Sequence, residues 1–297
     1  MRLGGAFNIA DYIPLLGALD LQGLERDTKK VSKKIDEMLE KIMEEHEQDP
    51  IKQKEQHKNF IDKLLASLHQ PINPRDEEIQ AIDKTNIKAI ILELIFAAFD
   101  TTAATLDWTF SQLLRNPRVM KKLQQEIQNV VGMNKMVEET DVPKLNYLDM
   151  VMKEVFRLHP VAPLLLSHES MEDITMNGYY INKKSRILVN AWAIGRNPNI
   201  WSENVQEFYP ERFNDSSIDL KGHNFELIPF GSGRRSCPGM QLGLMTDKFT
   251  VAQLVHCFDW ELPNNMKPQS LDMNEKFCVT ISRAKHILAL PTYRLIQ

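Results

Sequence analysis

The chain has 297 residues, of which 43% are hydrophobic and 26% charged, and its formal net charge is −4. This is the composition of a globular protein, and the slight negative charge argues against nucleic acid as a partner. The three cysteines, Cys237, Cys257 and Cys278, have no CxxC spacing. That pattern argues against a disulfide framework or a cysteine-built zinc site and favours a reducing compartment.

Helices are predicted through the first half of the chain. Apolar residues recur at three- and four-residue steps over residues 24–48, which predicts an amphipathic helix. A short helix is expected over residues 59–69, and the longest helix over about residues 75–115. Residues 87–99 are nearly all apolar, so we expect the middle of the long helix to be buried on all sides. Because this run is shorter than a bilayer requires, no transmembrane segment is expected.

Two more helices are predicted over residues 117–132 and 145–160, the second ended by Pro160. Alternation over residues 174–194, with an Asn-Gly turn at 177–178, then predicts short strands. A helix is expected after Gly239, and strands are expected in the tail. The sequence therefore predicts a mainly α fold with a small β portion, in one domain spanning residues 1–297.

The segment FGSGRRSCPG, residues 230–239, places Cys237 just before a predicted helix. Unpaired N–H groups and the partial positive charge at a helix amino terminus stabilise a thiolate, as do Arg234 and Arg235 beside it. Three glycines in the segment let the backbone approach a bulky, flat group. This setting favours a metal ligand at Cys237. The alternative is a small buried core cysteine, which is how we interpret Cys257 and Cys278.

The long helix contains AAFDTT, residues 97–102. An Asp-Thr-Thr sequence is unusual in an apolar helix, although Thr hydroxyls can bond back to carbonyls of the preceding turn. Asp100 and Thr101 are candidates for an acid–alcohol pair that delivers protons in a dry pocket. The alternative is a helix with a few polar residues on an exposed turn, and the motif taken alone favours this alternative.

Glu154 and Arg157 stand at i and i+3 on one predicted helix, and FYPERF supplies Arg212 between aromatic residues. A buried Arg212 guanidinium is suited to binding Glu154 bidentately. The alternative for Glu154 and Arg157 is a surface ion pair that contributes little stability.

These four motifs, in the order in which they occur along the chain, resemble those of the cytochrome P450 family of haem-thiolate monooxygenases. FGSGRRSCPG resembles the cysteine loop of the family, AAFDTT its oxygen-activating helix, KEVFR its conserved-helix pair and FYPERF its meander. The stretch RLHPVAPLLLSHES is most like plant microsomal members that act in biosynthetic pathways of secondary metabolism.

The resemblance implies a haem b cofactor whose iron is bound by the Cys237 thiolate. Arg235 and His168 match positions that hold the haem propionates, for which a guanidinium is well suited. Phe230 and Gly231 would lie in the cofactor-binding loop, Phe230 near the thiolate. An ordinary surface histidine is the alternative for His168.

The resemblance also assigns the remaining candidates. Asp100 and Thr101 would support proton delivery to bound dioxygen. Glu154, Arg157 and Arg212 would form a buried structural triad that takes no part in the chemistry. Residues 161–166 would face the substrate.

The function implied is insertion of one oxygen atom from O2 into a lipophilic small molecule. Electrons would come from NADPH through a flavoprotein reductase, which would dock on a basic face near Arg234 and Lys248. The family implies membrane association, on the cytosolic face of the endoplasmic reticulum.

The chain departs from the family pattern in two respects. Ala98 replaces the usual glycine of the oxygen-activating motif. The resemblance also covers only the carboxyl-terminal part of the family's fold, so the amino-terminal part, with its membrane anchor, is expected to be missing. A truncated, catalytically inactive remnant is therefore the alternative, and we expect the isolated chain to aggregate and to bind haem poorly. A cysteine-nucleophile hydrolase is a third interpretation, which needs a basic partner for Cys237.

Overall fold

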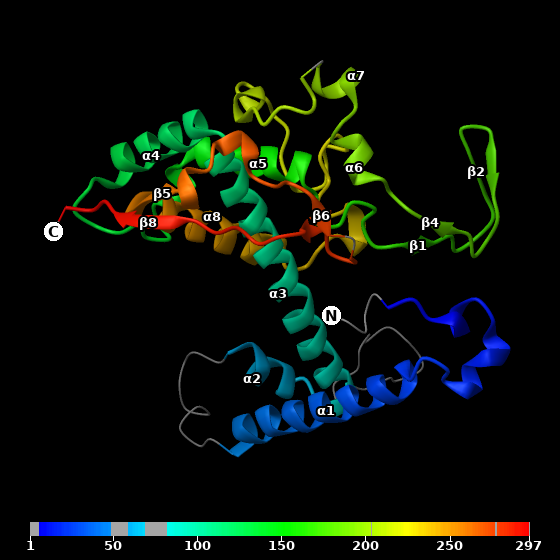
Figure 1. The fold of residues 1–297 in the computed structure, drawn as a ribbon. Helices are drawn as coiled ribbons and strands as arrows, with labels where there is room; N and C mark the ends of the chain where they lie inside the picture. Colours follow the sequence, from blue (N-terminus) through cyan, green and yellow to red (C-terminus); the bar gives the residue numbers. More distant parts are fainter. Residues whose placement is uncertain (1–5, 49–58, 69–81, 203, 277, 297) are drawn as a thin grey trace. The chain divides into compact units, whose positions relative to one another are not determined.

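The structure is a computed structural model that describes residues 6–48, 59–68, 82–202, 204–276 and 278–296. The chain divides into two compact units, residues 1–98 and 99–297. Figure 1 traces the chain through both of them. That the two units belong to one domain stays a prediction.

The first unit is helical. It contains two short 3-10 helices, then two α-helices and the beginning of a third: η1 (Ile9–Asp11), η2 (Pro14–Leu19), α1 (Leu24–Gln48), α2 (Phe60–Leu65) and α3 (Lys84–Arg115). The bounds of α1 are those that its apolar periodicity predicts. The small core of the first unit joins two residues of α1 to two of α3: Leu39, Met43, Ile87 and Ile91. Lys88 adds ion pairs from α3 to two carboxylates of α1, Asp36 at 2.7 Å and Glu40 at 2.6 Å.

The start of α3 is fixed by a reciprocal cap. The backbone N–H of Asn86 donates to Asp83 Oδ1 at 2.7 Å, and the N–H of Asp83 donates to Asn86 Oδ1 at 3.0 Å. These bonds satisfy amide groups that have no partner within the helix, so the helix begins at Lys84. The predicted earlier start is wrong for residues 82 and 83, and residues 75–81 lie outside the described residues.

The prediction that α3 is buried on all sides over residues 87–99 is also wrong. Residues 93–99 are all exposed, with Phe96 at 59% and Phe99 at 74%. A run that is apolar on every face needs cover on every face, and the described part of the chain does not supply it. By length and composition α3 could cross a membrane, whereas the shorter apolar run in the sequence led us to expect no transmembrane segment. A core helix of a soluble protein passes the same test.

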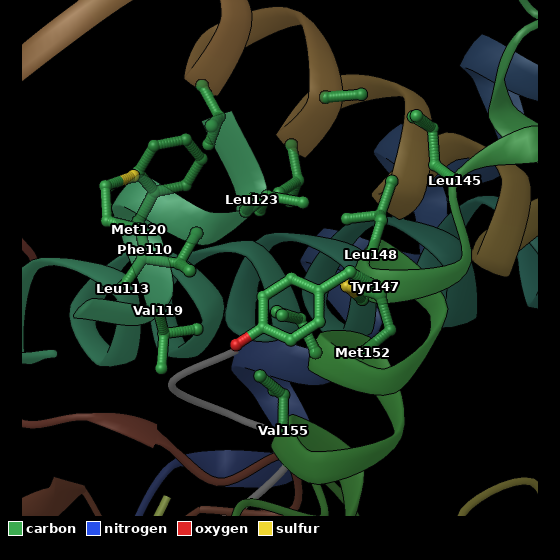
Figure 2. Close-up of a cluster of buried hydrophobic side chains, with 14 of the residues drawn as sticks. Phe110, Leu113, Val119, Met120, Leu123, Leu145, Tyr147, Leu148, Met152 and Val155 are labelled. Atoms are coloured by element: carbon green, nitrogen blue, oxygen red, sulfur yellow. The ribbon is translucent and has the colours of Figure 1, made fainter. Parts of the chain in front are cut away.

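The second unit is built on four helices: the later part of α3, α4 (Pro117–Val131), α5 (Asn146–Leu158) and α8 (Met240–Cys257). Figure 2 shows how side chains of α3, α4 and α5 point toward one another in its core. Leu113, Leu123, Leu148 and Met152 are fully buried there. The amphipathic pattern of α4 and α5 predicts this packing. Gly132 follows α4 with a positive φ of 86°, which a glycine adopts readily.

The remaining helices are short. They are η3 (Val142–Lys144), α6 (Ala191–Ile194), α7 (Pro198–Trp201), η4 (Pro210–Phe213), η5 (Gly233–Arg235), η6 (Pro263–Asn265) and η7 (Pro268–Ser270). The predicted strand is wrong at α6, because the side chain of Asn190 accepts a hydrogen bond from the N–H of Ala193 and caps a helical turn.

The β portion consists, within the described residues, of four antiparallel pairs. They are β1 (His168–Glu169) with β4 (Arg186–Ile187), β2 (Ile174–Met176) with β3 (Tyr179–Ile181), β5 (Phe258–Glu261) with β8 (Leu290–Tyr293), and β6 (Glu275–Lys276) with β7 (Ser282–Arg283). Asn177 and Gly178 join β2 to β3 with positive φ at both residues, as a two-residue hairpin turn requires. A mainly α fold with a small β portion is thus confirmed.

One buried carboxylate in α8 lacks the partners that such groups normally have. Asp247 is 3% exposed, and its Oδ1 has no hydrogen-bond partner within the described part of the chain. Burial raises the pKa of Asp247 to about 7. A carboxyl group that is easier to protonate in the folded state than in the unfolded state favours folding at low pH, and this contribution is lost as the pH rises through 7.

We expect Asp247→Asn to remove this pH dependence. The wild-type free energy of unfolding should fall by up to about 1.4 kcal/mol per pH unit as the pH rises from about 4 to 7, because the folded state then holds a proton on Asp247 that the unfolded state has lost. The variant should therefore gain stability relative to wild type between about pH 4.5 and 7, with no further gain above about pH 8, measured by urea unfolding. Glu172→Gln, at an exposed carboxylate, serves as the control. Parallel pH profiles for wild type and Asp247→Asn would contradict the prediction.

Candidate functional site

The Cys237 loop is closed by its own backbone. The N–H of Cys237 donates to the carbonyl of Phe230 at 2.8 Å, and the short helix η5 lies between them. Gly231 and Gly233 have φ values of 73° and 75°, in the left-handed region that a side chain disfavours. Ser232 Oγ donates to the carbonyl of Gly222 at 2.6 Å, which braces the loop from behind. The glycines are therefore required by the path of the loop.

The loop presents its thiol to solvent. Cys237 is exposed, whereas Cys257 is buried and Cys278 half-buried. The helix α8 begins just after the loop, with Gly239 at its N-cap. Burial raises the pKa of Cys257. Cys257 therefore behaves as the core cysteine that we predicted. The same prediction is wrong for Cys278, which is only half-buried, and Cys237 is the most exposed of the three.

Phe230 fastens the loop to the core of the second unit. Its ring packs edge-to-face on Phe156 of α5, with ring centroids 5.2 Å apart. Arg234 and Arg235, in the same loop, are exposed. Neither makes an ion pair within the described residues, so both guanidinium groups are available to an anionic ligand.

Glu154, Arg157 and Arg212 lie together. Arg157 binds Glu154 with two nitrogens, each 2.7 Å from a carboxylate oxygen, and Arg212 Nε lies 2.9 Å from Oε1. The expected geometry is thus wrong in one respect: the bidentate partner is Arg157, and Arg212 adds a single bond. Glu154 and Arg157 are both fully buried, which rules out a surface ion pair.

The rest of this network reaches the segment between α6 and η4. Arg157 also donates to the carbonyls of Gly195, Val205 and Glu207, while the N–H of Tyr209 donates to Glu154 Oε1 at 2.9 Å. Buried charges need this degree of hydrogen bonding to offset their loss of water. The network therefore holds in place an irregular segment that forms no β-sheet hydrogen bonds among the described residues.

Asp100 and Thr101 lie half-buried on α3. Two threonines further along α3 bond back to the helix: Thr105 Oγ1 donates to the carbonyl of Thr101 at 2.9 Å, and Thr109 Oγ1 donates to that of Thr105 at 2.7 Å. Asp100 forms no ion pair with the Cys237 loop in the described part of the chain. His168 is exposed on β1, opposite Ile187. A joint role for these residues with Cys237 stays a prediction.

The geometry of the loop fits a haem. A thiolate is a soft ligand that would suit haem iron. Cys237 is exposed, and a side chain at Gly233 would meet no atom within 4 Å, so the loop face is open to a flat group. No cluster of three or more His, Cys, Asp or Glu suited to a metal occurs among the described residues.

Two features of the second unit were missed by the sequence analysis. Glu211 binds Arg118 and Lys122 of α4 and the hydroxyl of Tyr147 of α5. Burial alone would raise the pKa of Glu211, but these hydrogen bonds outweigh it and lower that pKa to about 2. Trp108 of α3 stacks on His159, which follows α5, with ring centroids 4.0 Å apart and planes 6° from parallel. No local spacing signals either contact, since the partners are distant in sequence.

Comparison with known proteins finds a matching family and several relatives. The family described as Cytochrome P450 matches residues 4–288. The chain is 55% identical to Cytochrome P450 CYP736A12 of Panax ginseng over 99% of its length and 59% of that relative. It is 43% identical to Cytochrome P450 84A1 of Arabidopsis thaliana, over 99% of this chain and 59% of the relative. It is 42% identical to Flavonoid 3'-monooxygenase of Arabidopsis thaliana, over 99% and 57%.

The chain thus spans somewhat less than three fifths of the length of these relatives. The match nevertheless runs through all four motifs, from AAFDTT to FGSGRRSCPG. The chain belongs to the cytochrome P450 family.

Proposed function

We propose that this protein acts as a haem-dependent monooxygenase on a lipophilic small molecule. The observation that carries the proposal is the exposed Cys237 thiol in a glycine-rich loop, within a chain of this family. Haem iron, when bound, supplies the chemistry that activates O2, so that one oxygen atom enters the substrate and the other leaves as water.

The protein's own contribution begins with holding the cofactor, which we propose to be haem b. Cys237 supplies the thiolate, and Gly231 lets the backbone lie close to the ring. Arg235 is exposed and free of ion pairs among the described residues, which suits charge-assisted bonding to a propionate. His168 is assigned to a second propionate. Phe230 packs between the loop and α5, and so holds the thiolate in position.

Other residues are assigned to proton transfer, support and substrate contact. Asp100 and Thr101 would move protons at the carboxylate and hydroxyl oxygens on α3. Glu154, Arg157 and Arg212 would support the fold without touching the substrate. The turn at residues 161–166 would face the substrate.

We infer that electrons reach the site from NADPH through a reductase that docks on basic residues. Arg234 is the stronger candidate for this contact, because Lys248 Nζ already lies 2.5 Å from Asp149 Oδ1. We also propose membrane association at the cytosolic face of the endoplasmic reticulum, as for the plant microsomal proteins that the motifs resemble.

A catalytically inactive form of such an enzyme is the second candidate. A cysteine hydrolase finds no support, because no histidine in the described residues bonds to Cys237, which leaves the thiol without a general base.

We expect Cys237→Ser to abolish thiolate-type haem binding. The purified chain would be incubated with haem, reduced and exposed to carbon monoxide. Any haem that the wild type takes up, even if uptake is poor, should then show the Soret shift characteristic of thiolate ligation, and the variant should not show it. Cys278→Ser, at a half-buried cysteine, serves as the control and should behave as wild type. A thiolate-type spectrum in Cys237→Ser would overturn the assignment, and a wild type that takes up no haem would favour the inactive form.

We expect Glu154→Gln to destabilise the fold and not merely the chemistry. The change leaves two buried guanidinium groups without their carboxylate, a loss of about 3–5 kcal/mol for a buried pair. Urea unfolding should show this loss. Glu207→Gln is the matched control, because only the backbone carbonyl of this exposed residue joins the network. Unchanged stability in Glu154→Gln, with haem binding lost, would assign Glu154 to the site itself.

A further inference from the structure

The turn at residues 161–166 is held by its backbone carbonyls. The carbonyl of Val161 accepts from the N–H of Ile281 at 2.8 Å, and that of Pro163 accepts from the N–H of Trp192 at 3.1 Å. Within the turn, the N–H of Leu165 donates to the carbonyl of Ala162 at 3.0 Å. Two segments distant in sequence therefore fix alternate residues of one short loop.

The turn is strained and apolar. Leu165 has a φ of 51°, in the left-handed region that a branched, bulky side chain disfavours. Its neighbours Leu164 and Leu166 are 44% and 77% exposed. Backbone strain persists only where surrounding contacts hold it, and it is concentrated at functional sites. The two exposed leucines are thus displayed by a turn that would relax if its anchors were weakened.

The anchor at Ile281 leads back to α3. Trp108 is 1% exposed, and its indole Nε1–H donates to the carbonyl of Ile281 at 3.1 Å. Ile281 is therefore bonded on both sides, its carbonyl to Trp108 and its N–H to Val161. A buried side chain of the long helix is connected to the turn through a single residue.

Trp108 itself is fixed by His159, two residues before the turn. The rings are stacked, and Gln112 Nε2 lies 2.7 Å from His159 Nε2, which must then accept that bond and be unprotonated. Burial, and then the nearby Arg196, Arg157, Arg115 and Arg283, lower the pKa of His159 to about 3. The imidazole is therefore neutral at physiological pH, which suits a close parallel stack on an indole.

We propose that Trp108 is a positioning residue that holds the turn at residues 161–166 in its strained form, through Ile281. The inference rests on the proposed function for one point only, that this turn faces the substrate. Trp108 touches no reacting group; it acts by fixing where Leu164 and Leu166 are displayed.

The test compares Trp108→Phe with Trp260→Phe in the whole chain. Each change keeps an aromatic ring and removes one indole N–H bond, to the Ile281 carbonyl or to the Leu254 carbonyl at 2.9 Å. Amide hydrogen exchange should become at least tenfold faster at Ile281 and Leu165 in Trp108→Phe, and should stay as in wild type there in Trp260→Phe. Thermal unfolding of each variant establishes that both still fold cooperatively.

Unchanged exchange at Ile281 in Trp108→Phe, or equal acceleration in both variants, would overturn the proposal. If Trp108→Phe does not fold, Leu165→Gly tests it from the turn. A glycine relieves the strain that works against the anchor, so exchange at Ile281 should slow, and faster exchange would contradict the proposal. These measurements need no haem, so their outcome is independent of the Cys237→Ser experiment on the proposed function.

Discussion

The second unit depends on one buried carboxylate. Glu154 accepts hydrogen bonds from Arg157, Arg212 and the backbone of Tyr209, and Arg157 passes the connection on to three carbonyls. Charges removed from water are tolerated only when they are paired and hydrogen-bonded, so every member of this network constrains the others. Through it a regular helix, α5, organises a long segment that has little secondary structure.

The same helix supports the candidate site. Phe156, two residues after Glu154, packs on Phe230 at the start of the Cys237 loop. The carboxyl end of α5 leads through His159 into the turn at residues 161–166, which is anchored to Ile281 and Trp192. Loops carry function when a rigid scaffold positions them. Here the buried face of α5 contacts the Cys237 loop, and the end of α5 leads into the turn at residues 161–166. The charge network keeps that helix in place.

Local chemistry was predictable from the sequence, and tertiary cover was not. The bounds of α1, the hairpin turn at Asn177 and Gly178, and the mainly α fold follow from periodicity and turn propensity. The meeting of Glu154 with Arg157 follows from helical spacing, but which arginine binds bidentately depends on how the chain returns at residue 212. Exposure of residues 93–99 and the contact of Trp108 with Ile281 depend on segments remote in sequence, about which local patterns carry no information.

The contrast between Cys237 and Cys257 is the strongest argument for where chemistry lies. Both belong to the stretch that contains α8, one before its start and one at its end. Burial raises the pKa of Cys257 and so disfavours its thiolate, which leaves a small apolar side chain in the core. Cys237 is instead exposed in a loop whose glycines adopt left-handed φ and whose two arginines have no ion-pair partner in the described residues. Packing alone does not require left-handed glycines and two arginines around an exposed cysteine, so these features point to chemistry at Cys237.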